Sequence, residues 1–117
     1  MADYFKFVLT AATVFILMSA VAAWAGASPE KVQQGEKIYA ERKCSACHMI
    51  HGKGGKVGPD LSVIGDRRDE EWLEKFLSNP KSVFPETIMP SFRGSHGELE
   101  VLAEYLESLK KEVDSPK

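Results

Sequence analysis

The sequence has only two cysteines among its 117 residues, and it has no excess of positive charge. A formal net charge of −2 disfavours nucleic-acid binding, because phosphate recognition needs a concentrated basic surface. No stretch alternates between polar and apolar side chains, which argues against a β-sheet as the main scaffold. The chain is also too short for two separate cores, so we expect one small domain.

Charge is missing altogether from residues 7–27. The apolar run in this segment ends in Ala23-Trp24-Ala25, the small-x-small pattern that precedes a leader-peptidase cleavage site. Residues 1–25 are therefore expected to be a signal peptide. A retained N-terminal membrane anchor is the alternative, because residues 7–25 approach the length needed to cross a bilayer. In both cases residues 26–117 form a domain that is exported across a membrane.

Three segments carry the signals of an α-helix. The first is expected from about Pro29 to Lys43, because Ser28 can cap it and proline suits the first helical position. The second is expected over about nine residues after the cap Asp69, and it stops at Asn79-Pro80. The third is expected over residues 95–112, beginning with a capping box. Long loops join these segments, so the predicted class is all-α.

Both cysteines lie in the stretch KCSACHMIHG, residues 43–52. Residues i, i+3 and i+4 share one face of a helical turn, so Cys44, Cys47 and His48 can point at a single object. C-x-x-C-H is the attachment signature of c-type haem. A disulfide would leave the histidine unused, a thioredoxin-like pair is expected near a βαβ pattern, and zinc needs a fourth ligand at suitable spacing. The motif predicts one haem c, covalently bound through Cys44 and Cys47.

The chain resembles a small class I c-type cytochrome of the bacterial periplasm over residues 29–112. The motif from Cys44 to His48 carries most of this resemblance. Three weaker stretches, Gly58-Pro59-Asp60-Leu61, Trp72 to Pro80 and Ile88-Met89-Pro90, occur in the family's order. The resemblance implies the cytochrome c fold, with three main helices and long loops wrapped around one haem. It also implies a periplasmic protein, either free or tethered to the inner membrane.

Haem iron held by His48 needs a second axial ligand, and electron carriers usually supply a methionine sulfur. Met89 is the predicted ligand, because it lies in the loop between the last two helices and Pro90 biases its backbone toward an extended conformation. Ligation by His96 and a core-filling role for Met89 are the competing interpretations. The resemblance also implies that the backbone carbonyl of Pro59 accepts a hydrogen bond from His48.

Other side chains are expected to pack around this centre. The resemblance places Gly35 and Tyr39 against Leu102 and Tyr105, where the first and last helices cross. Trp72 is expected either to pack or to bond a haem propionate. Six apolar side chains are expected to bury the ring: Ile38, Leu61, Ile64, Phe76, Phe84 and Phe92.

These predictions describe a one-electron carrier that transforms no substrate and is not an enzyme. The expected partners are redox proteins, such as a membrane oxidoreductase or a terminal reductase or oxidase, and the expected state is a monomer. Two alternatives stay open. The domain could be a tethered cytochrome subunit of a respiratory or dehydrogenase complex, or a haem enzyme or gas sensor with an open sixth site.

Overall fold

Three α-helices supply the scaffold of the computed structural model, which describes residues 27–111. The predicted leader or anchor lies outside these residues. Within them, no helix combines the length and the apolar character that a membrane span requires. The elements follow in the order α2 (Pro29–Glu41), η1 (Cys44–Ala46), β1 (Met49–Ile50), β2 (Lys53–Gly54), η2 (Ile64–Asp66), α3 (Glu70–Ser78), η3 (Pro80–Ser82) and α4 (His96–Ser108).

The predicted N-terminal caps start all three helices. The Ser28 hydroxyl accepts a hydrogen bond from the Lys31 N–H at 3.3 Å, and Pro29 follows the cap. Asp69 accepts from the Trp72 N–H at 2.9 Å. A full capping box starts α4 at Ser95. Local side-chain chemistry therefore fixes where each helix begins.

The end of α2 differs from the prediction, because the helix stops at Glu41 rather than at Lys43. Arg42 is the C-cap, and Lys43 adopts the left-handed conformation with φ 56°. This residue turns the chain out of the helix axis. Cys44 consequently begins a separate 3₁₀ turn, η1, and Cys47 is the C-cap of that turn.

The end of α4 also comes earlier than predicted, at Ser108 rather than near residue 112. The carbonyl oxygen of Leu109 accepts a hydrogen bond from the Gly65 N–H at 2.9 Å. Two residues later, the Lys111 N–H donates to Asp66 Oδ2 at 2.7 Å. These contacts with η2 replace further helical bonds and hold the segment after α4 in an extended conformation.

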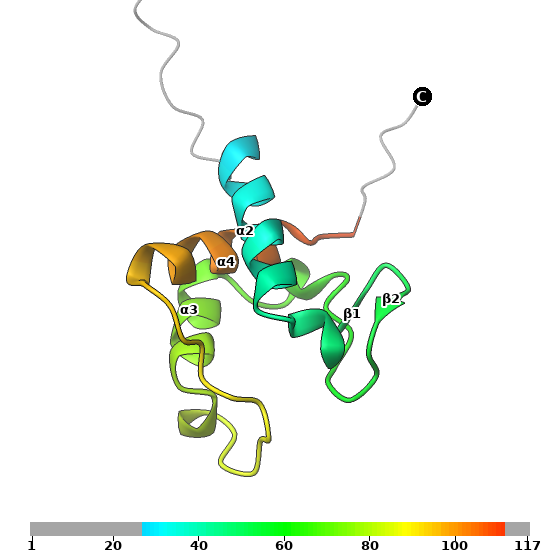
Figure 1. The fold of residues 1–117 in the computed structure, drawn as a ribbon, viewed down its shortest axis with the longest axis vertical. Helices are drawn as coiled ribbons and strands as arrows, with labels where there is room; N and C mark the ends of the chain where they lie inside the picture. The colour runs from blue at the N-terminus through cyan, green and yellow to red at the C-terminus, as the bar shows by residue number, and fades with distance from the viewer. Residues whose placement is uncertain (1–26, 112–117) are drawn as a thin grey trace, which may run out of the picture.

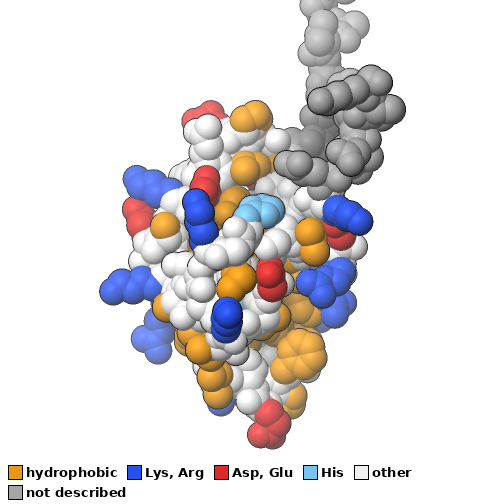
Figure 2. Space-filling model, turned by 90° about the vertical axis from the view of Figure 1, so that its right-hand side faces the viewer, with side chains coloured by type: hydrophobic (Ala, Val, Ile, Leu, Met, Phe, Trp, Pro, Cys, Tyr) orange, Lys and Arg blue, Asp and Glu red, His pale blue; other side chains and the backbone are white. Residues whose placement is uncertain are grey.

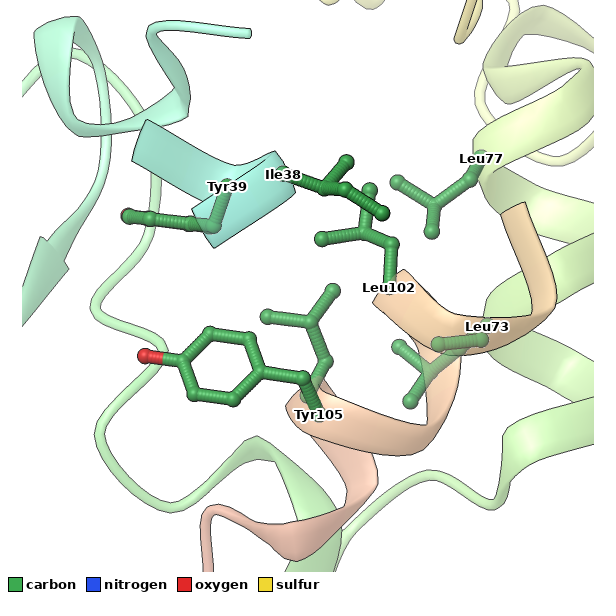
Figure 3. Packing of buried hydrophobic residues seen from close by; sticks show 8 residues of the cluster. Ile38, Tyr39, Leu73, Leu77, Leu102 and Tyr105 are labelled. Carbon is green, nitrogen blue, oxygen red and sulfur yellow. The ribbon is translucent and has the colours of Figure 1, made fainter. Parts of the chain in front are cut away.

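The core lies where α2 and α4 cross and α3 packs beside them (Figure 1). Figure 3 shows side chains from all three helices converging, and the buried set is Ile38, Tyr39, Leu73, Leu77, Leu102, Ala103, Tyr105 and Leu106. At the crossing, Gly35 is buried and the Tyr39 and Tyr105 rings meet edge to face, with centroids 5.9 Å apart. The helix crossing expected from the resemblance is therefore present.

A short hairpin follows the cysteine turn, in a part of the chain where the sequence predicts only loop. Met49 pairs with Gly54, and Ile50 pairs with Lys53. His51 and Gly52 take positive φ values of 48° and 78° to close the turn. Two-residue strands are too short to give an alternating pattern, so the sequence offers no signal for them. The all-α class still holds.

Candidate haem-binding site

The two cysteines and His48 lie on one tight turn. The N–H groups of Cys47 and His48 both donate to the carbonyl oxygen of Cys44, at 3.1 and 3.0 Å. Both thiols are free. Cys44 is half-buried against the helical core, where burial raises the pKa of its thiol, whereas Cys47 is exposed. The turn thus presents two separate thiol groups next to one imidazole.

The His48 ring is held by the loop that follows the hairpin. Its Nδ1 lies 2.9 Å from the carbonyl oxygen of Pro59, which is the contact that the resemblance implies. A carbonyl can only accept, so Nδ1 carries the proton and Nε2 keeps its lone pair. Gly58 packs against the ring: a Cβ atom there would lie 2.5 Å from Cε1 and 2.8 Å from Nδ1. The loop therefore fixes both the tautomer and the position of the imidazole.

Backbone hydrogen bonds wrap this loop around the cysteine turn. The Gly55 N–H donates to Ser45 at 2.8 Å, and the Gly58 N–H donates to Cys47 at 2.7 Å. A third bond, 2.8 Å long, joins the Leu61 N–H to Met49. All these partners lie within residues 44–61, so this short segment holds its own geometry.

Met89 lies in the segment between η3 and α4. Figure 1 shows this yellow segment and the hairpin on opposite sides of the lower half of the molecule. Met89 is half-buried and packs against the helical core, and its N–H donates to Thr87 Oγ1 at 3.2 Å. Three residues later, the Phe92 N–H donates to the carbonyl of Leu77 in α3 at 2.8 Å.

His96, the competing sixth ligand, lies at the exposed start of α4. Its side chain is 75% exposed, and Nε2 lies 3.2 Å from Glu100 Oε1 one turn along the helix. The contacts of Met89 and His96 thus differ: the thioether faces the core, while the imidazole pairs with a carboxylate at the surface.

The aromatic side chains form a stack along α3. The Trp72 and Phe76 rings lie parallel with centroids 5.0 Å apart, and the Arg68 guanidinium lies 4.2 Å from the centroid of the Trp72 ring. Phe84 meets Phe76 edge-on but is 51% exposed. These contacts give Trp72 a packing role.

The remaining apolar side chains expected around the ring are not equivalent. Leu61, Ile64 and Phe92 are half-buried around the core, whereas Ile38 is fully inside it, between the helices. Lys53 in the hairpin and Lys56 just after it are both exposed. Figure 2, which views the molecule from the hairpin side of Figure 1, shows lysine and arginine side chains around apolar ones.

Two charged side chains have long-range partners that the sequence does not reveal. Glu98 is recognisable from the sequence only as a member of the capping box, yet it also binds Arg42 at 3.1 Å. Glu104 is 7% exposed and binds both the Ser28 N–H, at 3.2 Å, and Lys31 Nζ, at 3.3 Å. In the sequence, Glu104 shares one helix face with Glu100 and Glu107, so nothing there distinguishes it as buried.

Comparison with known proteins defines the class. Residues 32–110 match the family model for Cytochrome c. The chain therefore belongs to the cytochrome c family, as a small class I c-type member. Family membership implies covalently bound haem c. The site fits that group, because it offers two free thiols three residues apart and an imidazole whose Nε2 lone pair is available.

Two curated relatives are parts of larger redox proteins. The chain is 31% identical over 86 residues to cytochrome c oxidase subunit 2 of Alkalihalophilus pseudofirmus, covering 66% of this chain and 25% of that protein. It is 28% identical over 88 residues to a subunit of the nitric oxide reductase of Stutzerimonas stutzeri, covering 70% of this chain and 60% of that one. The chain thus spans a quarter and three fifths of these relatives.

A solved structure of similar size shares the fold. The c-type cytochrome SorU from Sinorhizobium meliloti superimposes with a TM-score of 0.57 at 25% identity. The match covers 71% of this chain and 94% of SorU.

Proposed function

We propose that this protein carries single electrons through one haem c. The turn that presents Cys44 and Cys47 beside His48, with Nδ1 of His48 bound to Pro59, is the observation that carries the proposal. Bound haem supplies an iron that alternates between ferrous and ferric states. The two cysteines would attach the ring, and His48 would bind the iron through Nε2. The Pro59 carbonyl holds the tautomer and the orientation of the imidazole.

Met89 is the proposed second axial ligand. Its half-buried position against the core and the hydrogen bonds on either side of it support this assignment over His96. His96 already pairs with Glu100, and binding iron would require it to leave the surface of α4. Two protein ligands on the iron leave no open position for a substrate, so we assign no catalysis to the domain.

The proposed partners are redox proteins that donate or accept one electron, such as a membrane oxidoreductase or a terminal reductase or oxidase. The names of the two relatives, an oxidase subunit and a reductase subunit, support a place in a respiratory chain. They also favour a second candidate function, a cytochrome subunit tethered by an uncleaved leader. SorU, a c-type cytochrome of which the match covers 94%, supports the first candidate, because there this domain makes up nearly the whole chain.

One set of spectra tests the haem assignment. The protein is produced in cells competent in cytochrome maturation, and mass spectrometry and optical and magnetic circular dichroism spectra are recorded. We expect covalent haem and a low-spin His/Met spectrum. Met89→Ala should keep the haem and bind added imidazole, while the matched control His96→Ala should change nothing. An unchanged low-spin spectrum in Met89→Ala would remove Met89 from the assignment, and carbon monoxide binding by the reduced wild type would favour an enzyme or sensor.

The native N-terminus distinguishes the carrier from the tethered subunit. The free carrier requires cleavage after Ala25, so that mass spectrometry finds a chain that begins at Gly26. A chain that retains residues 7–25 and sediments with membranes would instead establish the anchor.

A further inference from the structure

Arg42 connects the two halves of the candidate site. It is the C-cap of α2 and lies two residues before Cys44. Its guanidinium, however, contacts residues that follow Met89. Nη2 lies 3.1 Å from Glu98 Oε1, and Cζ lies 5.4 Å from the centroid of the Phe92 ring.

The carboxylate of Glu98 is shared between Arg42 and the chain that enters α4. Oε1 accepts from Arg42, while Oε2 accepts from the Ser95 N–H at 2.8 Å. The chain is folded closely around this group, because a Cβ atom at Gly94 would lie 2.6 Å from the Phe92 ring and 2.7 Å from Oε2. Arg42 is thus linked by direct contacts, its own and those of Glu98, to the turn from Phe92 to Ser95.

This turn fixes the downstream end of the Met89 segment. Within the described part of the chain, the first backbone hydrogen bond to another element after Met89 is the one from Phe92 to Leu77 in α3. The Arg42 guanidinium lies over the Phe92 ring and also pairs with Glu98. Only two residues separate Met89 from this anchor, so the anchor restricts where the Met89 segment can lie.

The pair differs from most other ion pairs of the described residues. Lys37 with Glu41 and Lys110 with Glu107 each lie within one stretch of chain, and both lysines are exposed. Arg42 and Glu98 are 56 residues apart, and both side chains are more than half buried, at 39% and 37% exposure. A planar guanidinium can bind a carboxylate and cover an aromatic ring together, which an ammonium group cannot do equally well.

We propose that Arg42 is a positioning residue that holds Met89 on the iron, by fastening the turn after Met89 to the helix that leads into the cysteine motif. This inference rests on the proposed function, and in particular on ligation by Met89.

The expected consequence concerns competition for the sixth position. An external ligand binds only the fraction of molecules in which Met89 has left the iron, so its apparent affinity rises with that fraction. A partly exposed ion pair and one cation–π contact together correspond to roughly a fivefold change in such an equilibrium. Arg42→Gln should therefore bind imidazole roughly fivefold more tightly than the wild type.

The test is an imidazole titration of the oxidised holoprotein. Binding is monitored through the loss of the absorption spectrum of the Met-ligated form. Imidazole is neutral, so a changed net charge hardly affects its approach. Lys37→Gln is the matched control, because it removes the same charge from the same helix and breaks the exposed pair with Glu41. Its imidazole affinity should equal that of the wild type.

The Met89→Ala background separates positioning from a general structural effect. If Arg42 acts through Met89, Arg42→Gln should not change imidazole affinity when Met89 is already absent. An effect that persists in Met89→Ala, or equal affinities in Arg42→Gln and Lys37→Gln, would overturn the proposal. Failure of the proposed function looks different, because the wild type would then bind imidazole as readily as Met89→Ala does.

A conservative variant covers the case in which Arg42→Gln fails to give holoprotein. Arg42→Lys keeps the positive charge but loses the planar guanidinium with its several N–H donors. Its affinity for imidazole should therefore lie between those of the wild type and Arg42→Gln. Amide hydrogen exchange at Phe92 provides a second readout. Exchange should be faster in Arg42→Lys than in Lys37→Arg, and equal rates would contradict the proposed anchor.

Discussion

The backbone of Gly35 in α2 lies directly against Tyr105 of α4. A Cβ atom at position 35 would collide with the Tyr105 Cβ and with the carbonyl oxygen of Val101. Neither of these atoms can rotate away, since one belongs to the backbone and the other is attached to it. The two terminal helices therefore approach as closely as they do only because position 35 has no side chain.

Gly35→Ala is expected to lower the free energy of unfolding by about 2 kcal/mol, because overpacking outweighs the better helix propensity of alanine. Guanidinium unfolding of the two proteins measures the difference. Gly97→Ala is the control, since no atom lies within 4 Å of its added Cβ, and it should leave stability unchanged or slightly higher. Equal effects of the two substitutions would contradict the close approach.

Gly58→Ala should weaken the hold of His48 on the iron while leaving the haem attached. The added Cβ would lie 2.5 Å from Cε1 of the His48 ring, and the displaced ring would lose its bond to Pro59. Loss of such a supporting bond weakens metal binding about tenfold or more. Because protons compete for the imidazole, the acid midpoint of the low-spin spectrum should rise by about one pH unit. A midpoint equal to that of Gly97→Ala would refute this role.

Glu104 should matter far more for stability than an exposed glutamate. Glu104→Ala removes the buried acceptor of the Ser28 N–H and the partner of Lys31, which costs about 1–3 kcal/mol. Glu104→Gln keeps an acceptor, so its effect should be smaller. Glu41→Gln, from an exposed pair within α2, should change the free energy of unfolding by less than about 0.5 kcal/mol. Similar values for Glu104→Ala and Glu41→Gln would contradict the prediction.

Alkaline pH should destabilise the fold through Tyr39. Burial is the main cause that raises the pKa of Tyr39 to about 12. The unfolded chain releases this proton near pH 10. Stability from this group is therefore complete below pH 10 and is lost as the pH rises from 10 towards 12.

Ultraviolet titration of tyrosinate, with unfolding measured at each pH, checks this expectation. Tyr39→Phe should reduce the alkaline loss. Part of the loss should remain, because burial also raises the pKa of Tyr105. Ionisation of Tyr39 near pH 10 in the folded protein would contradict the assignment.

The parts of the fold that follow from the sequence are those set by neighbouring residues. The side chains of Ser28, Asp69 and Ser95 each accept a hydrogen bond from the N–H three residues ahead. A capping pattern of this length can be recognised in the sequence. The class, the three helices and the haem family are predictable for this reason. The hydrogen bond between His48 and Pro59 is expected from resemblance alone, because residues 11 apart in a loop have no periodic signal.

The parts that the sequence does not reveal depend on contacts between distant segments. The early end of α4 requires Asp66 to accept from Lys111, 45 residues away. The pair of Arg42 with Glu98 likewise joins segments whose approach is set by the helix crossing. Such contacts become visible only when the three helices are placed in space.

The segment from Cys44 to Leu61 closes through bonds between near neighbours, whereas Met89 depends on partners far away in the chain. Local contacts form quickly, and proteins open in cooperative units of roughly contiguous chain. The segment from Cys44 to Leu61 can therefore stay closed when the contacts of the Met89 segment with the rest of the chain open. The two proposed iron ligands, His48 and Met89, are thus held in place with unequal stability. Under mild denaturant, the proposed bond from Met89 to the iron should break in a subglobal event while the proposed bond from His48 persists.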